Sequence, residues 1–202
     1  MRALLLVAIA VLTLTRAGHA QRPVLDASFG AAGGPWRANV AGLWQIVHGG
    51  RIRLGAGPRL NHFGGDGGTY RTHDPRPTGL PSRIRLEPSV WSLNLMVSAE
   101  LRVPGPFEVG ANLDLAGVAI GESRAAGAER LRPARGSLFL YGDRDRGSLN
   151  SEYYLSLLLG RGLRVRAGAS HYVTGYRVTG GPVRPRYLRF DTVPFLAVRW
   201  GS

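Results

Sequence analysis

Side chains alternate between apolar and polar along the stretch from Ser89 to Gly117, with one interruption at Pro104-Gly105-Pro106. Before the interruption, every second residue from Trp91 to Leu101 is apolar, and the residues between them are nearly all polar or charged. The same pattern resumes at Phe107. A period of two is typical of a β-strand with two unlike faces, so this stretch predicts a long antiparallel hairpin.

The same alternation recurs along the chain and predicts eight strands, at about residues 25–29, 36–47, 52–61, 89–102, 107–117, 152–159, 163–173 and 188–200. Three connections are tight, at 48–50, 104–106 and 160–162, and longer ones fall at about 64–88, 120–150 and 177–186. Apart from a first short connection near 33–35, tight and long connections alternate. This order predicts an all-β, eight-stranded antiparallel up-and-down barrel with its tight turns at one end, the asymmetry of transmembrane barrels of the outer membrane.

Charged residues fall on one face of the predicted strands. The apolar faces contain no Arg, Asp or Glu, and their titratable residues are Tyr153 and His171. The opposite faces hold nine arginines and six acids: Arg37, Arg51, Arg53, Arg59, Arg102, Arg164, Arg166, Arg189, Arg199, Asp26, Glu100, Glu108, Asp114, Glu152 and Asp191. The chain therefore separates a charged face from an apolar one in every strand.

Two arrangements fit this separation, and they differ in the direction of the apolar face. A soluble lipocalin-like barrel would line a ligand cavity with it, but the interior of eight strands only holds side chains or one small ligand. Four tryptophans and many aliphatic residues would overfill that space, whereas outside they would form the apolar band that a bilayer requires. We therefore expect an outward apolar face, with lipid-interface aromatics at Trp36, Trp91, Phe107, Tyr153, Phe190 and Trp200.

The first twenty residues have a basic residue at Arg2, an apolar run and small residues at Gly18 and Ala20. This layout predicts a secretory signal peptide over 1–20, cleaved after Ala20, and one barrel domain over 21–202. A membrane-spanning helix needs about 20 apolar residues, and Arg16 interrupts the run. The sequence has no cysteine, so no disulfide stabilises the exported chain.

All 26 basic residues are arginine, and the chain has 13 acidic residues. Removing the two arginines of the signal leaves 24, so the net charge of the mature chain is +11. An exported chain without a run of five basic residues does not favour nucleic acid as a partner, and anionic lipid or lipopolysaccharide is the expected counterpart. Seven loop arginines are candidate lipopolysaccharide contacts on the external rim, where guanidinium groups pair bidentately with phosphates: Arg71, Arg76, Arg83, Arg85, Arg130, Arg132 and Arg135. A merely solvated rim is the alternative.

From Leu25 to Trp200 the chain resembles the small eight-stranded outer-membrane β-barrel proteins of the OmpA/OmpX-like class. The resemblance lies in the strand pattern and in the last strand, where Phe190, Leu196, Val198 and Trp200 are similar to the terminal strand that the outer-membrane insertion machinery reads. The chain ends Trp200-Gly201-Ser202, not on the aromatic residue itself. The resemblance implies an outer-membrane location and that machinery as a partner during biogenesis.

If the charged face lines the lumen, the strand directions bring one set of charges together near the tight turns: Asp26, Arg51, Arg53, Glu100, Arg102, Glu108, Arg164, Arg166 and Arg199. Three acids cannot neutralise six arginines, so we expect water or bound anions to complete the network. The hypothesis is a plugged, hydrated lumen, because eight strands leave little room for a conducting pore. No cofactor or metal is expected.

An enzyme interpretation starts at His171. The run Ser170-His171-Tyr172-Val173 is similar to the His-aromatic-Ser pattern of outer-membrane lipid A deacylases, which hydrolyse an acyl ester in the outer leaflet. Val173 stands where the nucleophilic serine belongs, however, and Ser170 points the other way. We therefore expect no catalysis, with the lipid A hydrolase and the soluble ligand-binding barrel as rival interpretations.

Two loop motifs carry weaker signals. Asp143 to Gly147 resembles the start of a calcium loop, but arginines alternate with the acids, and a solvated turn is expected. The glycine-rich segment from Gly64 to Gly68 has no following lysine, so a flexible loop is expected there. The overall prediction is a monomeric outer-membrane barrel with a structural or surface-interaction role, whose specific ligand and physiological role do not follow from the sequence.

Overall fold

The computed structural model describes residues 23–72, 81–126, 129–138, 147–160, 162–179 and 185–201. Within these ranges the chain forms thirteen strands: β1 (Val24–Ala31), β2 (Pro35–Gly49), β3 (Ile52–Gly65), β4 (Gly68–Arg71), β5 (Arg83–Leu86), β6 (Ser89–Arg102), β7 (Phe107–Gly121), β8 (Arg124–Ala126), β9 (Glu129–Pro133), β10 (Gly136–Leu138), β11 (Leu149–Gly160), β12 (Leu163–Thr179) and β13 (Arg186–Trp200). No helix in the described part of the chain is long and apolar enough to cross a membrane. The predicted signal peptide over 1–20 lies outside these residues.

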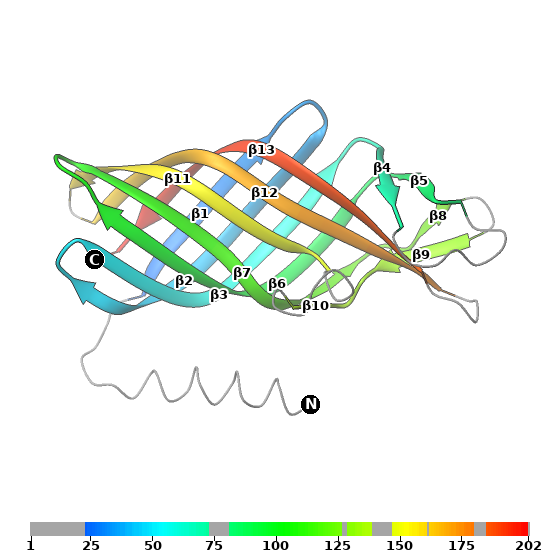
Figure 1. Ribbon diagram of the computed structural model, residues 1–202, viewed down its shortest axis with the longest axis horizontal. Helices are drawn as coiled ribbons and strands as arrows, with labels where there is room; N and C mark the ends of the chain where they lie inside the picture. The colour runs from blue at the N-terminus through cyan, green and yellow to red at the C-terminus, as the bar shows by residue number, and fades with distance from the viewer. Residues whose placement is uncertain are drawn as a thin grey trace.

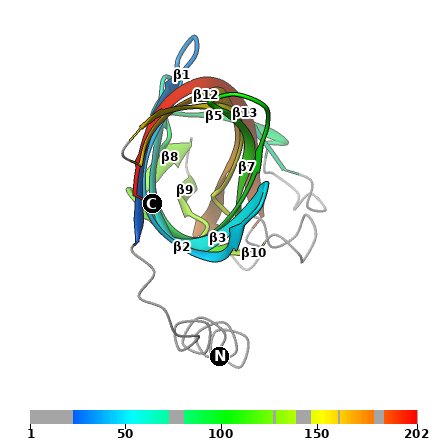
Figure 2. The ribbon, with the colours of Figure 1, turned by 90° about the vertical axis from the view of Figure 1, so that its left-hand side faces the viewer.

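Eight long strands form a closed antiparallel barrel. Around the barrel the order is β1, β2, β3, β6, β7, β11, β12 and β13, and β13 pairs with β1 to close it. Figure 2 looks into the open ring of these strands. The eight-stranded antiparallel barrel predicted from the alternation is therefore confirmed.

The tight turns gather at one end of the barrel, on the left of Figure 1. Glycines with positive φ lie in these turns, with φ of 62° at Gly50, 82° at Gly105 and 92° at Gly160, a backbone region that only glycine adopts at little cost. Leu25 pairs with Trp200, so β1 begins and β13 ends at this same end. We call it the short-turn end and the opposite one the long-loop end.

At the long-loop end, five short strands extend the barrel wall, on the right of Figure 1. The strand β4 pairs with β13, and β9 pairs with the last residues of β12; β5 and β8 add to their outer edges, and β10 pairs with β7. The prediction that 64–88 and 120–150 are loops was thus wrong for these segments. The flexible loop expected at 64–68 is the end of β3, a turn at Asp66 and the start of β4.

Burial follows the predicted alternation: charged positions point into the barrel, and apolar positions point out. In β1, for example, Asp26 is buried and its neighbours Leu25 and Ala27 are exposed. Two bulges, in β2 and β7, reverse which residues point inward and which point outward, and the sequence pattern does not predict them. One in β2 leaves both Ile46 and Val47 exposed, and one in β7, opposite the Leu95–Met96 step, shifts the outward positions beyond it.

Candidate functional site

The lower part of the lumen, near the short-turn end, is filled by ion pairs. Asp26 contacts Arg166, and its Oδ2 lies 2.6 Å from Arg199 Nε. Arg199 also contacts Glu100, whose other carboxylate oxygen lies 3.3 Å from Arg53 Nε. Strands β1, β3, β6, β12 and β13 supply these five side chains, so the group joins opposite walls of the barrel.

Glu108 continues this group toward the turns. It contacts Arg53, and its carboxylate lies 3.3 Å from Arg164 Nε and 3.7 Å from Arg102 Nε. The Arg102 side chain is 54% exposed, so it lies at the mouth of the barrel. Arg51 is exposed too, and its backbone oxygen accepts a 2.7 Å hydrogen bond from Arg102 N. Eight of the nine charges expected near the short turns are thus joined by side-chain ion pairs.

A second group of charges lies higher in the lumen, centred on Glu152. Its carboxylate lies 2.8 Å from Arg37 Nη2 and 3.3 Å from Arg59 Nη1. Arg59 also pairs with Asp114, at 2.5 Å between Nη2 and Oδ1. Five asparagine side chains donate to these two carboxylates, from Asn39, Asn61, Asn94, Asn112 and Asn150. The alternation in the sequence placed these charged residues on the inner face, but it did not predict that they contact one another.

The two groups meet at Arg166, whose Nη1 lies 4.0 Å from Glu152 Oε2. Together they contain six arginines that are buried or nearly so and five buried acids: Arg37, Arg53, Arg59, Arg164, Arg166, Arg199, Asp26, Glu100, Glu108, Asp114 and Glu152. In this buried set the arginines exceed the acids by one; the predicted excess of three near the short turns included Arg51 and Arg102, which are exposed. The lumen charges nearly neutralise one another, but buried nitrogen atoms such as Arg37 Nε and Arg166 Nε have no hydrogen-bond partner among the described residues, so polar groups remain for water to satisfy.

Two aromatic rings lie among these charges, and one of them, Phe195, is on the inner face of β13. The guanidinium carbon of Arg37 lies 4.8 Å from the ring centre of Phe195, and that of Arg166 lies 4.4 Å from the ring centre of Tyr154. Such cation–π contacts are strongest where water is excluded. The Tyr154 hydroxyl also donates to Glu100 Oε1, at 3.1 Å.

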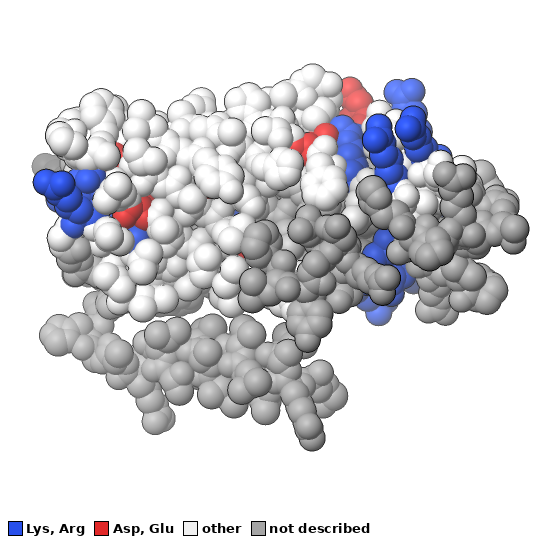
Figure 3. Space-filling model, viewed as in Figure 1, with Lys and Arg blue, Asp and Glu red and all other residues white. Residues whose placement is uncertain are grey.

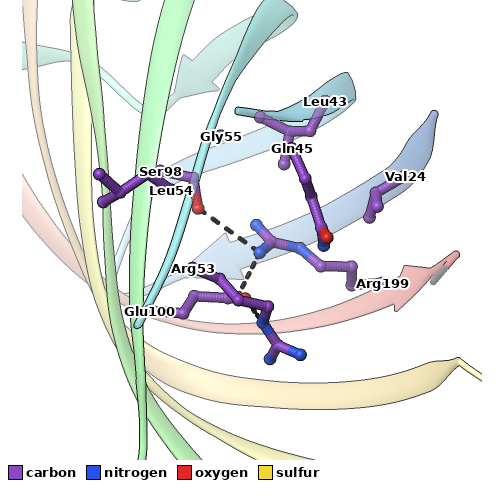
Figure 4. Close-up of a pocket in the computed structure, with 9 residues that line it drawn as sticks. All are labelled: Val24, Leu43, Gln45, Arg53, Leu54, Gly55, Ser98, Glu100 and Arg199. Carbon is purple, nitrogen blue, oxygen red and sulfur yellow. Dashed lines mark hydrogen bonds and ion pairs between the residues drawn. The ribbon is translucent and has the colours of Figure 1, made fainter. Parts of the chain in front are cut away.

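Little free space remains among these side chains. The pocket drawn in Figure 4 has a volume of about 10 Å³, about the space of one water molecule. It is lined by Val24, Leu43, Gln45, Arg53, Leu54, Gly55, Ser98, Glu100 and Arg199. The ion pairs of Arg199 and Arg53 with Glu100 cross it in Figure 4, so it lies within the charge network.

Toward the long-loop end the lumen contains a cluster of buried apolar and aromatic side chains, which we call the apolar cap: Phe63, Tyr70, Ile84, Leu86, Val90, Ala119, Leu131, Tyr172, Tyr176, Val178, Tyr187 and Val193. The short strands β4, β5 and β9 contribute four of them. The Tyr70 hydroxyl lies 2.8 Å from Thr174 Oγ1, and burial raises the pKa of Tyr70. The cap therefore lies above the charged groups, toward the long-loop end.

Outside the barrel, large apolar side chains form what we call the apolar belt: Leu25, Phe29, Val40, Trp44, Leu60, Trp91, Leu93, Phe107, Val109, Tyr153, Leu155, Phe190, Leu196, Val198 and Trp200 are each at least 40% exposed. Five of the six predicted interface aromatics are in this group, and Trp36 is half-buried. In Figure 3 the belt is the white band, with basic residues beyond it at both ends.

The belt has the height of a bilayer core. Phe190 and Trp200 lie at its two edges on β13, ten residues apart. At about 3.3 Å per residue and a tilt of about 40°, ten residues cover roughly 25 Å along the barrel axis. Outer-membrane barrels carry an apolar band of about 25 Å between two aromatic girdles.

One aromatic contact of this surface was missed from the sequence. His62 lies between two tryptophans, with its ring stacked on Trp91 at 4.1 Å and edge-on to Trp36 at 4.9 Å between ring centres. Its outward position follows from pairing with Ala38 and Trp91. The predicted third strand ended at Asn61, whereas β3 continues to Gly65.

His171 is exposed on the outward face, as predicted, and stacks on Phe190 at 5.9 Å between ring centres. Its Nδ1 lies 2.8 Å from Thr192 Oγ1, on the neighbouring strand. Val173 is buried, and the Ser170 hydroxyl points inward and donates to Asn150 Oδ1 at 2.6 Å. In the described residues no group of His, Asp and Glu side chains could hold a metal ion.

Six of the seven rim arginines are exposed at the long-loop end: Arg71, Arg83, Arg85, Arg130, Arg132 and Arg135. Arg76 lies outside the described residues, as does the calcium-like segment 143–146. Five of the six belong to β4, β5 and β9, and Arg135 lies in the turn before β10. The expected ring of arginines is therefore uneven, with most members on one side.

No protein-family model matches the sequence, and no curated protein matches it. Among solved structures the chain is similar to Neisserial surface protein A, with a TM-score of 0.45 and 12% identity over 89% of this chain and 96% of that one. It is also similar to the Yersinia pestis outer membrane protein Ail, with a TM-score of 0.39 and 9% identity over 89% of this chain and 98% of that one. Its own strand order and pairing identify the chain as a closed eight-stranded antiparallel β-barrel.

Proposed function

We propose that this chain is a monomeric outer-membrane barrel protein that acts as a structural or surface-interaction element. The observation that carries the proposal is the apolar belt, which encircles the barrel with the height of a bilayer core. In water such a continuous apolar surface would be an aggregation site. In a membrane it is the surface that lipid requires.

The contents of the lumen support a membrane barrel over a soluble ligand-binding barrel. A lipocalin-like protein would have its apolar face inside and charges outside, and this barrel has the reverse. Its charges are paired across the lumen, as between Arg59 and Asp114, and the pocket between Arg53, Glu100 and Arg199 has about the space of one water molecule. This pocket is far smaller than the roughly 300 Å³ or more that a small-ligand site occupies.

The barrel's orientation follows from its two ends. Outer-membrane barrels have short periplasmic turns and longer external loops, so the short-turn end belongs in the periplasm and the extended wall outside the cell. Partners on this proposal are outer-leaflet lipid, lipopolysaccharide, and the insertion machinery that reads the last strand. Export through the predicted signal peptide is part of the same proposal.

The lumen is proposed to be sealed. The charge network fills its lower part, and the apolar cap, which includes Tyr70, Tyr176 and Phe63, closes its upper part. Single-channel recording on the protein in planar bilayers tests this point directly. We expect no stable conductance, and a steady open level of sizeable conductance would contradict the seal.

A catalytic role has one specific observation in its favour, the contact between His171 Nδ1 and Thr192 Oγ1. A hydroxyl beside an imidazole is the arrangement of an activated nucleophile, and Ser151 is the neighbour of His171 on the other side. We propose no catalysis, because the carboxylate of Asp191, next to Thr192, is paired with Arg189 at 2.8 Å. Release of fatty acid from lipopolysaccharide by the purified protein, lost in both His171→Ala and Thr192→Val, would establish the rival function.

Membrane residence itself is tested by fractionation and by gel migration. The mature protein should sediment with outer membranes and migrate faster on gels when unheated, because a folded barrel resists detergent until it is heated. A protein that stays in the soluble fraction and migrates alike before and after heating would overturn the proposal.

A further inference from the structure

The outward face of three neighbouring strands, β11, β12 and β13, carries a row of polar side chains within the apolar belt. Ser151 lies directly opposite His171, and His171 lies directly opposite Thr192 on its other side. Directly opposed residues in an antiparallel pair share one face of the sheet, and these three strands lie side by side in Figure 1. Ser151 is partly exposed, and His171 and Thr192 are exposed. We call the three residues the polar row.

Apolar side chains surround the polar row. Toward the long-loop end, the next outward residues on the three strands are Leu149, Val173 and Phe190. Toward the short-turn end, the outward residues of the same strands are apolar except for Tyr153: Leu155, Leu157, Leu159, Leu163, Val165, Ala167, Ala169, Pro194, Leu196, Val198 and Trp200. The polar row therefore interrupts a surface that is otherwise suited to hydrocarbon.

The polar row has hydrogen-bonding groups that the barrel does not satisfy. His171 Nδ1 lies 2.8 Å from Thr192 Oγ1, which accounts for one of the two ring nitrogens. In the described part of the chain, His171 Nε2 and the Ser151 hydroxyl form no hydrogen bond with a protein group. An unpaired polar group in hydrocarbon is costly, because no water is there to satisfy it. A lipid group is the available partner for both atoms.

The polar row lies at the depth where the acyl chains of a lipid join its headgroup. Phe190 lies at the belt edge toward the long loops, and the aromatic girdles of such barrels sit at headgroup level. Thr192 is two residues nearer the middle of the belt on the same strand. Two residues at about 3.3 Å each and a tilt of about 40° cover roughly 5 Å along the axis. The row therefore faces the acyl linkages just below the headgroups, and the chain ends lie deeper.

Two small side chains lead from the polar row toward the middle of the belt. Ala169 and Ala167 follow His171 on the outward face of β12, and both are exposed; we call them the alanine track. Their directly opposed neighbours on β11 and β13 are larger residues: Tyr153, Leu155, Pro194 and Leu196. An acyl chain that lies on the track is contacted from below and from both sides, and these added contacts are individually weak but sum along the chain.

We propose that the polar row binds an acyl ester of outer-leaflet lipopolysaccharide and that the attached acyl chain lies on the alanine track. The inference rests on the proposed function, because the proposed orientation places this end of the belt in the outer leaflet. The Thr192 hydroxyl donates to His171 Nδ1, so Nε2 carries the proton and donates to the ester carbonyl together with the Ser151 hydroxyl. An ester oxygen accepts both bonds and brings no N–H group that would need a partner. The ester remains intact.

The test changes the polar row and the alanine track separately. Ser151→Ala/Thr192→Val removes two hydroxyl groups at nearly constant volume. Its control is Ser156→Ala, because Ser156 lies on the same strand, is buried in the lumen and has no hydrogen-bond partner among the described residues. Ala169→Leu fills the track, and its control is Ala99→Leu, which enlarges an exposed alanine on the outward face of β6.

The purified full-length proteins are titrated in nonionic detergent with three probes. These are lipopolysaccharide, the same lipopolysaccharide after mild alkaline hydrolysis of its acyl esters, and phosphatidylethanolamine. Gel migration before and after heating checks the barrel of every variant, and free fatty acid is measured at the end of each titration.

Each hydrogen bond of ordinary net strength contributes about fivefold in affinity, so the double variant should bind lipopolysaccharide about twentyfold more weakly. Ala169→Leu should bind it about fourfold more weakly, the value of roughly one lost methylene contact. Both controls should stay within about twofold of the unaltered protein. Alkali-treated lipopolysaccharide and phosphatidylethanolamine should bind weakly to every protein.

Full affinity in the double variant or in Ala169→Leu, or an equal loss in its control, would overturn the proposal. Phosphatidylethanolamine that binds as tightly as lipopolysaccharide would also overturn it, because the row would then recognise acyl esters of any lipid. Fatty acid released from lipopolysaccharide by the unaltered protein would replace binding with hydrolysis.

These outcomes are distinct from a failure of the proposed function. If the unaltered protein shows no heat-dependent migration and no membrane association, the membrane barrel itself is wrong, and the polar row loses its outer-leaflet setting with it. If migration and membrane association are normal but the row and track variants bind as tightly as their controls, the acyl-ester site alone is wrong.

Discussion

Replacing Val40 with arginine distinguishes a lipid-facing belt from a surface in water. Val40 is 58% exposed and lies on β2, four residues from Trp36 and four from Trp44. Four residues cover about 10 Å along the axis at about 3.3 Å per residue and a tilt of about 40°, so Val40 is near the middle of the belt. In water this exposed substitution changes the free energy of unfolding by no more than about 0.5 kcal/mol.

At the bilayer midplane, arginine on the lipid face costs about 2 to 4 kcal/mol, and near the interface it costs about 0 to 1 kcal/mol. Ile120→Arg is the matched control, because Ile120 is 69% exposed and lies opposite Trp91 near the edge of the belt. We expect Val40→Arg to lower the free energy of unfolding by about 2 to 4 kcal/mol and Ile120→Arg by about 1 kcal/mol or less.

The assay is urea unfolding of the protein from phosphatidylcholine vesicles, followed by the fluorescence of its four tryptophans. Both variants are measured with the unaltered protein under the same lipid conditions. Equal costs at the two positions, or no cost at Val40, would show that depth in a bilayer does not govern these residues and would refute the belt.

Three further predictions concern the lumen and the wall, and all are measured by the same unfolding assay. Glu152→Gln leaves Arg37 and Arg59 without their shared carboxylate and should lower the free energy of unfolding by about 3 to 5 kcal/mol. The control is Glu122→Gln, whose side chain is 73% exposed, and it should lower that free energy by no more than about 0.5 kcal/mol. Similar values for the two variants would argue against a buried network. Gly57→Ala should destabilise the barrel by about 1 to 3 kcal/mol, because a Cβ at this position would lie 1.8 Å from the backbone oxygen of Gly42. Gly136→Ala is the control, because a Cβ there meets nothing within 4 Å. A Gly57→Ala protein as stable as the unaltered one would refute the close approach of β2 and β3. Tyr70→Phe removes the hydroxyl beside Thr174 and should cost about 1 kcal/mol, and no change would count against that contact in the cap.

The faces of the strands could be predicted from the sequence because the side-chain period of a strand is fixed at two. Asp26 and Arg199 are far apart in the chain, yet both were placed on the inner face and both contribute to one network. The depth of each residue in the lumen depends on register between strands, which alternation does not determine. Glu152 and Arg59 were therefore placed on the correct face, but their pairing could not be predicted.

The extended wall could not be predicted for a related reason. Its strands are three to five residues long, too short to give a clear alternation, and glycine and proline nearby favoured loops. The segment 83–86 alternates arginine with apolar residues, but four residues are too few to identify a strand. It forms β5 because it pairs with β4, and β4 in turn pairs with the part of β13 that extends beyond β1. The bulges could not be predicted either. One extra residue, Ile46 in β2 or Leu115 in β7, moves the residues after it to the opposite face of the strand, and the composition of the strand gives no sign of it.

The lipid-facing belt is tested most directly by spin labels on adjacent residues, and the absence of native cysteine allows each label to be placed alone. Leu60 is 45% exposed on the outward face and Asn61 is fully buried in the lumen. With the protein in phosphatidylcholine vesicles, Leu60→Cys should carry a label that oxygen relaxes strongly and a water-soluble nickel complex does not, and a label at Asn61→Cys should be reached weakly by both. A Leu60 label that the nickel complex reaches as freely as it does in water would contradict the claim that this face of the barrel contacts lipid.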